Sequence, residues 1–177
     1  MSRVPSQFPR PAAPDDPQTA VLARKLDARL RTEFPGVFAG FVRAADGGFD
    51  VYSTGDPALA LLVQELQAES GGRIAVRVVT GVTNSLAVLE RLHEDVRVRN
   101  GELRARGIVF GWGIDVRRNR LRLEVVDLTP EKAAFLVTAF GAARVEVVEG
   151  QLYAPGTNAK SVSSADGDSE PVTPAPR

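Results

Sequence analysis

Two stretches of the chain alternate apolar and polar residues, and each is broken once by a short polar turn. The second stretch, residues 107–126, has its alternate positions apolar: Phe110, Trp112, Ile114 and Val116 before the turn, and Leu121, Leu123 and Val125 after it. The turn spans residues 117–120 and has Asn119 where a hairpin needs a positive φ. This pattern predicts two β-strands that form a hairpin.

Other segments have apolar residues every three to four positions, which is typical of helices that bury one face. The four predicted stripes are Val21, Leu22, Leu26 and Leu30; Leu59, Leu62, Val63 and Leu66; Leu86, Leu89, Leu92 and Val96; and Ala133, Leu136, Val137 and Phe140. Start signals precede them: Asp16-Pro17, Asp56-Pro57, Asn84 or Ser85, and Thr129-Pro130. Asn100-Gly101 is expected to end or break the third helix, with one more turn over residues 102–106.

Residues 36–81 and 107–150 read alike, each as hairpin, helix and strand, which indicates duplication of a β-β-α-β module. We therefore predict an α+β fold of two similar β-β-α-β units. Each unit is expected to form a three-stranded antiparallel sheet with a helix on one face, its last strand beside its first. A linking helix joins the units, and an N-terminal helix precedes them.

Changes in composition predict the organisation of the chain. Residues 1–16 are proline-rich and expected to be disordered, and residues 156–177, rich in Pro, Ser, Asp and Thr, are expected to be a flexible tail. The first unit with its helix occupies 17–82. The linking helix and second unit occupy 83–155.

The whole-chain composition is that of a globular protein, with 44% hydrophobic and 25% charged residues. Cysteine is absent, which excludes disulfides, cysteine zinc sites and a thiol nucleophile. No apolar run is long enough to span a bilayer, so no membrane partner is expected. The first residues lack the apolar core of a signal peptide, and a cytoplasmic location is expected for the chain as it stands.

Catalytic and metal-binding patterns are weak, and we predict that the chain is not an enzyme and needs no cofactor. His93, the one histidine, lies on a predicted amphipathic helix and is expected to be a partly exposed helix residue near Glu90 or Asp95. The acidic residues lack the spacing of a calcium loop. Gly111-Trp112-Gly113 lies inside a strand, which favours close approach of another backbone or a bend over a phosphate loop.

Arginines are dense between positions 97 and 122. This segment has eight of them and only two acidic residues, Glu102 and Asp115. Nucleic-acid binding would use such a cluster. It is not expected here, because the 22 basic and 22 acidic residues of the whole chain balance. A solvated hairpin tip or an acidic protein partner explains the cluster better.

One hairpin motif resembles a known family. The sequence motif W-G-x-D-V-R-x-N-R-x-x-x-E, which begins at Trp112, resembles a motif in the pro-domains of α-lytic protease, streptogrisins and other secreted bacterial chymotrypsin-like serine proteases. The likeness is best over residues 85–153. The motif residues are Trp112, Asp115, Val116, Arg117, Asn119 and Arg120.

The resemblance implies a protein that is not an enzyme and that binds, inhibits and assists the folding of a chymotrypsin-like protease, in cis in a longer precursor or in trans. It implies that the last strand of the second unit extends a protease hairpin and that the following tail enters the protease cleft. The residues implied are Arg144, Val145, Glu146, Val147, Val148 and Glu149 in the strand, and Gln151, Leu152, Tyr153, Ala154 and Pro155 in the tail. An open sheet edge is physically suited to such docking.

Two departures from the family leave an alternative open. The chain contains no protease domain and no export signal, whereas the family role implies secretion. The alternative is an intracellular interaction or scaffold module that keeps the fold without a protease partner.

Overall fold

The computed structural model of the 177-residue chain describes residues 17–150. The predictions for residues 1–16, for 151–155 and for 156–177 lie outside the described residues. The elements, in chain order, are α1 (Pro17–Glu33), β1 (Phe38–Arg43), β2 (Phe49–Ser53), α2 (Pro57–Glu69), β3 (Val76–Thr80), α3 (Leu86–Ala105), β4 (Phe110–Asp115), β5 (Arg120–Val125), α4 (Pro130–Phe140) and β6 (Val145–Glu149).

The helices begin where their capping residues predict. The Asp56 carboxylate accepts the N–H of Ala58 at 2.8 Å, and the Thr129 hydroxyl accepts that of Lys132 at 3.3 Å. Ser85 caps α3 in the same way through Val88. Each bond satisfies an amide that the first helical turn leaves without a partner, so the sequence alone fixes these starts.

Helix α3 does not end or break at Asn100-Gly101, as the sequence suggested, but continues to Ala105. Val96 before the glycine and Leu103 after it are both fully buried in the second core. Their burial outweighs the cost of about 1 kcal/mol that a glycine imposes inside a helix.

The predicted α+β fold of two β-β-α-β units is confirmed, but the pairing of the last strand was wrong. Strand order is β1-β2-β3 in the first sheet and β4-β5-β6 in the second. Strands β3 and β6 run parallel to β2 and β5, so both sheets are mixed rather than antiparallel. The direction of each last strand is the expected one, but its neighbour is the second strand instead of the first.

The second unit lies against β1 of the first, since helix α3 contacts β1, Val116 packs onto Gly40, and Arg117 donates to the carbonyl of Arg43. In both units the last strand pairs parallel with the second strand. The helix between these two strands supplies the long connection that a parallel pair needs.

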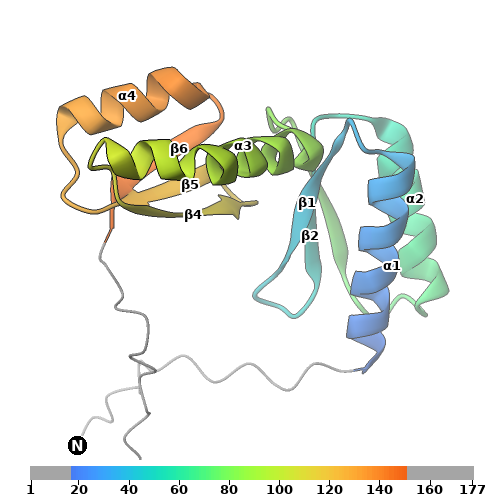
Figure 1. The fold of residues 1–177 in the computed structure, drawn as a ribbon. Coiled ribbons are helices and arrows are strands. Elements are labelled where there is room, and N and C mark those ends of the chain that lie inside the picture. The colour runs from blue at the N-terminus through green and yellow to red at the C-terminus, as the bar shows by residue number, and fades with distance from the viewer. Residues whose placement is uncertain (1–16, 151–177) are drawn as a thin grey trace, which may run out of the picture.

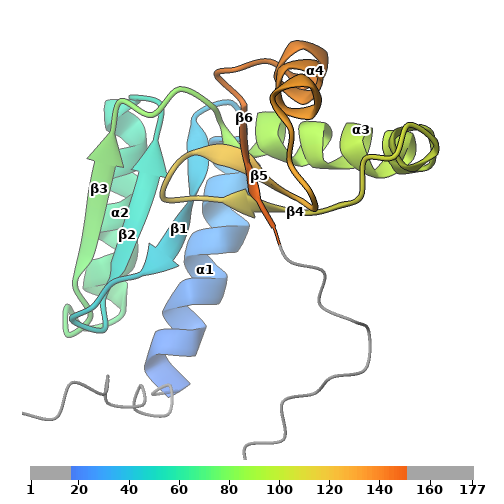
Figure 2. The same ribbon diagram turned by 90° about the vertical axis from the view of Figure 1, so that its left-hand side faces the viewer.

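Two separate cores lie between the sheets and their helices (Figure 1). Helices α1 and α2 cover one face of the first sheet, and α3 and α4 cover one face of the second. Helix α3 belongs to both cores, because Leu86 packs in the first and Leu92 and Val96 pack in the second. The opposite face of the second sheet has no helix on it among residues 17–150 (Figure 2).

Candidate partner-binding surface

The β4–β5 turn is built by Asp115 and Asn119. The Asp115 carboxylate accepts the N–H of Arg118 at 3.0 Å, and Asn119 has φ 55°. The predicted positive φ is therefore present. Asparagine suits this position because its short polar side chain can form local hydrogen bonds in the left-handed region.

Asn119 also joins the turn to the segment before α3. Its side chain accepts the N–H of Asn84 at 2.6 Å and donates to the Asn84 carbonyl at 2.7 Å. The Asn84 amide in turn donates to the carbonyls of Asn119 at 3.0 Å and Ala143 at 3.1 Å. Both asparagines are buried, so these bonds satisfy polar groups that water cannot reach.

Val116 and Arg117 connect the same turn to the first unit. A Cβ placed on Gly40 would lie 3.0 Å from both Cγ atoms of Val116. Arg117 donates from Nη2 to the Arg43 carbonyl at 2.9 Å. Asp115, Val116, Arg117 and Asn119 of the hairpin motif thus shape the turn and hold the two units together.

The other two motif residues lie elsewhere on the hairpin. Trp112 packs against the second core and is half-buried, with its ring 5.4 Å from that of Phe110 and 6.0 Å from that of His93. Arg120 is exposed at the start of β5. The indole N–H of Trp112 is buried without a hydrogen-bond partner in the described part of the chain.

Strand β6 is an edge strand with β5 as its one neighbour. The Arg144 carbonyl accepts the N–H of Leu121 at 2.8 Å, and the N–H of Gly150 donates to the Val125 carbonyl at 2.8 Å. Because bonding groups alternate along a strand, the N–H and C=O of Val147 and Glu149 point away from β5. These are the groups to which a further strand can bind.

The side chains of β6 divide between the two faces of the sheet. Val145 is buried and Val147 packs at the margin of the core, while Glu146 and Val148 lie on the open face and Glu149 is exposed. Glu146 forms an ion pair with Arg118, and its other oxygen is buried without a partner in the described part of the chain. The exposed acid at the end of β6 is therefore Glu149.

Gly150 fixes the place where the chain leaves the sheet. A Cβ on this residue would lie 2.7 Å from the backbone carbon of Glu124, closer than real Cβ atoms come. Only glycine allows this approach. The predicted tail, residues 151–155, therefore starts from a fixed position beside Glu124 and itself lies outside the described residues.

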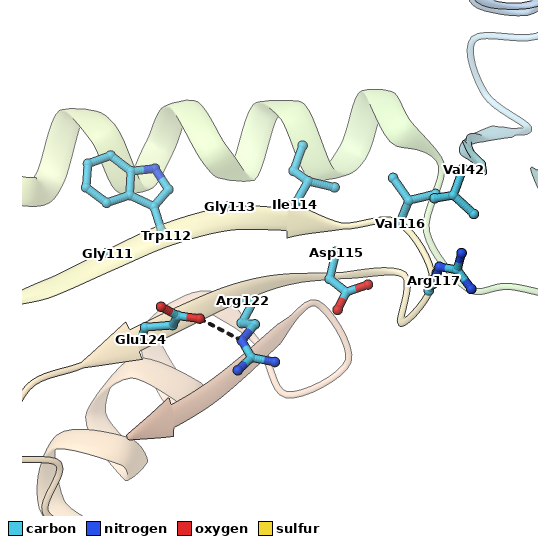
Figure 3. A pocket seen from close by; sticks show the side chains of 10 residues that line it. All are labelled: Val42, Gly111, Trp112, Gly113, Ile114, Asp115, Val116, Arg117, Arg122 and Glu124. Atoms are coloured by element: carbon cyan, nitrogen blue, oxygen red, sulfur yellow. Dashed lines mark hydrogen bonds and ion pairs between the residues drawn. The ribbon is translucent and has the colours of Figure 1, made fainter. Parts of the chain in front are cut away.

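An open hollow of about 660 Å³ runs along β4 and over part of β5 (Figure 3). Its lining residues are Val42, Gly111, Trp112, Gly113, Ile114, Asp115, Val116, Arg117, Arg122 and Glu124. In Figure 3 the side chains of Trp112 and Ile114 point toward α3, whereas Arg122 and Glu124 lie on the opposite side of the hairpin. Val42 and Val116 close one end.

Most of the clustered arginines have partners. Arg97, Arg99, Arg106, Arg118 and Arg122 form ion pairs, Arg104 bonds the side chain of Asn100, and Arg117 bonds the carbonyl of Arg43. The guanidinium of Arg97 lowers the pKa of Glu94 by hydrogen bonding. Five of the eight arginines are thus ion-paired, and Arg104 and Arg117 bond neutral oxygens.

Residues 17–150 have no group of three or more His, Asp and Glu side chains placed to hold a metal ion. None of the helices in this range is long and apolar enough to cross a bilayer. No protein-family model matches the chain, and no curated protein matches it in sequence.

Sequence reasoning did not find the role of Asn84. Its partner Asn119 is 35 positions away, and next to Ser85 the residue reads as one more candidate helix cap. The close approach of another backbone expected at Gly111 and Gly113 is not found among residues 17–150, where a Cβ on either would meet nothing within 4 Å. The sequence did not predict the hollow beside them.

Proposed function

We propose that this chain is a non-catalytic protein that binds a chymotrypsin-like serine protease, inhibits it and assists its folding. The contact is made by the free edge of β6 and by residues 151–155. The choice of partner rests on the resemblance of the hairpin motif and of residues 85–153 to the protease pro-domains.

The observation that supports the proposal best is the geometry of the β6 edge. Val147 and Glu149 direct their backbone groups outward, and no element among residues 17–150 covers them. A protease strand placed there would turn three strands into four and gain main-chain hydrogen bonds. Gly150, held against Glu124, then directs the tail from a defined point of the same interface.

Binding through this edge can be separated from overall stability by a matched pair of proline variants. Val147→Pro removes an outward N–H from β6. Val78→Pro removes the equivalent N–H from β3, the edge strand of the first sheet, where the Ala75 carbonyl accepts the Phe49 N–H at 2.8 Å. Circular dichroism tests whether both variants fold. Val147→Thr keeps the outward N–H and is expected to inhibit like the wild type.

The assay titrates the full chain against purified secreted bacterial chymotrypsin-like proteases and measures inhibition. Nanomolar inhibition is expected for the wild type and for Val78→Pro, with a large loss for Val147→Pro and for a chain truncated after Gly150. Equal inhibition by the two proline variants would remove the edge from the mechanism. Inhibition of no protease in the set would rule out the pro-domain function.

A further inference from the structure

Nothing among residues 17–150 requires Gly111 and Gly113 to be glycine. Neither residue has a positive φ, and a Cβ on either would meet nothing within 4 Å. Gly40, by contrast, combines φ 105° with a close contact to Val116. Glycine weakens a strand, so two of them at alternate positions of β4 are a cost that the folded chain does not explain.

The residues opposite these glycines leave them uncovered. In the register of the hairpin, Gly111 faces Glu124 and Gly113 faces Arg122. A large side chain at such a position often covers a glycine of the next strand. Here Arg122 and Glu124 pair with each other along β5, with Nε of Arg122 3.1 Å from Oε1 of Glu124. Their side chains therefore leave the surface of β4 at the two glycines open.

Strand β4 is also an edge strand with free backbone groups. The Val126 N–H donates to the Val109 carbonyl at 2.9 Å, so by alternation Gly111 and Gly113 bond β5 while Trp112 and Ile114 direct their N–H and C=O outward. Trp112 and Ile114 are only half-buried, although their neighbours Leu123 and Leu121 are fully buried. The edge therefore offers both hydrogen bonds and apolar surface.

The charges around the hollow favour a neutral polypeptide over an anion. Its rim holds Arg117 and Arg122 together with Asp115 and Glu124, and the first two are engaged with the Arg43 carbonyl and Glu124. A phosphate or nucleic acid would need unpaired cations. The amides and carbonyls of an extended chain need only the outward groups of β4.

We propose that β4 is a second docking site, separate from β6, which takes an extended segment of a partner protein with an aromatic side chain. The segment pairs with the outward groups of Trp112 and Ile114. Its aromatic ring lies over Gly111 and Gly113, in space that any other residue at the two glycine positions would fill. This site does not depend on the protease assignment.

Nuclear magnetic resonance on the full chain tests the site with two blocked tripeptides, acetyl-Thr-Tyr-Thr-amide and acetyl-Thr-Ala-Thr-amide. The tyrosine peptide is expected to shift the Gly111 and Gly113 amide resonances saturably, and the alanine peptide to bind at least about tenfold more weakly. Gly113→Val has room for its side chain and is expected to fold and to lose this binding. Val147→Pro in β6 is expected to keep it, whatever the protease assay shows.

Three results would overturn the proposal. One is equal binding of both peptides, or binding that Gly113→Val does not weaken. Another is a response to inorganic phosphate without a response to the tyrosine peptide. The third is a large gain in affinity for the tyrosine peptide when the chain is truncated after Gly150, since a segment of the chain itself would then be the occupant that competes for the site.

Discussion

Asn84 and Asn119 hold each other's backbone where the segment before α3 meets the β4–β5 turn. The side chain of Asn119 bonds the N–H and the C=O of Asn84, and the side chain of Asn84 bonds the carbonyl of Asn119. A further bond from Asn84 to Ala143 brings in the loop between α4 and β6. One buried pair therefore fixes the hairpin turn, the start of α3 and the approach to the candidate β6 edge.

Removing the Asn119 side chain is expected to destabilise the protein. Asn119→Ala leaves buried backbone groups of Asn84 without partners, which costs about 1–3 kcal/mol, and places alanine at φ 55°, which adds about 1–2 kcal/mol. Asn119→Gly carries the first cost without the second. Urea denaturation of both variants measures the two terms separately.

The matched control is Asn100→Ala, because Asn100 lies in α3 and its side chain accepts a hydrogen bond from the exposed Arg104. No loss of stability is expected for this variant, since alanine favours helix. If Asn119→Ala were as stable as Asn100→Ala, the hydrogen bonds between Asn84 and Asn119 would contribute nothing to stability.

Gly40→Ala is expected to cost about 1–3 kcal/mol, because the added Cβ meets Val116 at 3.0 Å and alanine is strained at φ 105°. Shortening the neighbour in the double variant with Val116→Ala should recover part of this loss, while the backbone strain remains. Thermal unfolding provides the measurement. Gly113→Ala, which adds a Cβ into open space, is the control and should unfold at or slightly above the wild-type temperature.

Gly101→Ala is expected to stabilise the protein by about 0.5–1 kcal/mol. Gly101 is exposed within α3, and a Cβ there would meet nothing within 4 Å. The denaturation midpoint in urea should rise without a change in slope. A fall in the midpoint would mean that the helix needs the glycine, for instance for a bend.

Asp46 is expected to titrate below the ordinary range of an aspartate. Its pKa is lowered first by the hydrogen bond from Arg77, with Nη1 at 2.6 Å from Oδ2, and then by the Gly48 N–H. Since the folded pKa is depressed, the stabilisation is complete above the ordinary aspartate pKa and is lost as the pH falls through the folded value. The group is exposed, so the effect on overall stability is small.

Carbon-13 titration of the Asp46 carboxyl measures this shift directly. In Arg77→Gln the pKa should return toward its ordinary value, whereas Arg73→Gln, an exposed change just before β3, should leave it depressed. If the Asp46 pKa were the same in Arg77→Gln as in the wild type, the ion pair would not be formed in solution.

Local patterns in the sequence determined the secondary structure and the helix caps of this protein. The period of the apolar residues predicted the strands and helices, because burial of one face imposes that period along the chain itself. The caps at Asp56, Ser85 and Thr129 and the positive φ of Asn119 were equally readable, since each depends on residues no more than a few positions apart. The free strand edge of β6 was expected from a small open sheet, although for a different strand order.

The tertiary structure decided which distant residues meet. No local sequence pattern shows that β3 and β6 lie beside the second strand of each unit, or that Asn84 and Asn119 are hydrogen-bonded to each other. Nor does one show that Val116 needs a glycine at position 40. Nor does a sequence distinguish Gly40, which the fold requires, from Gly111 and Gly113, which face open space. These differences arise from contacts between segments far apart in the chain, and packing in three dimensions sets them.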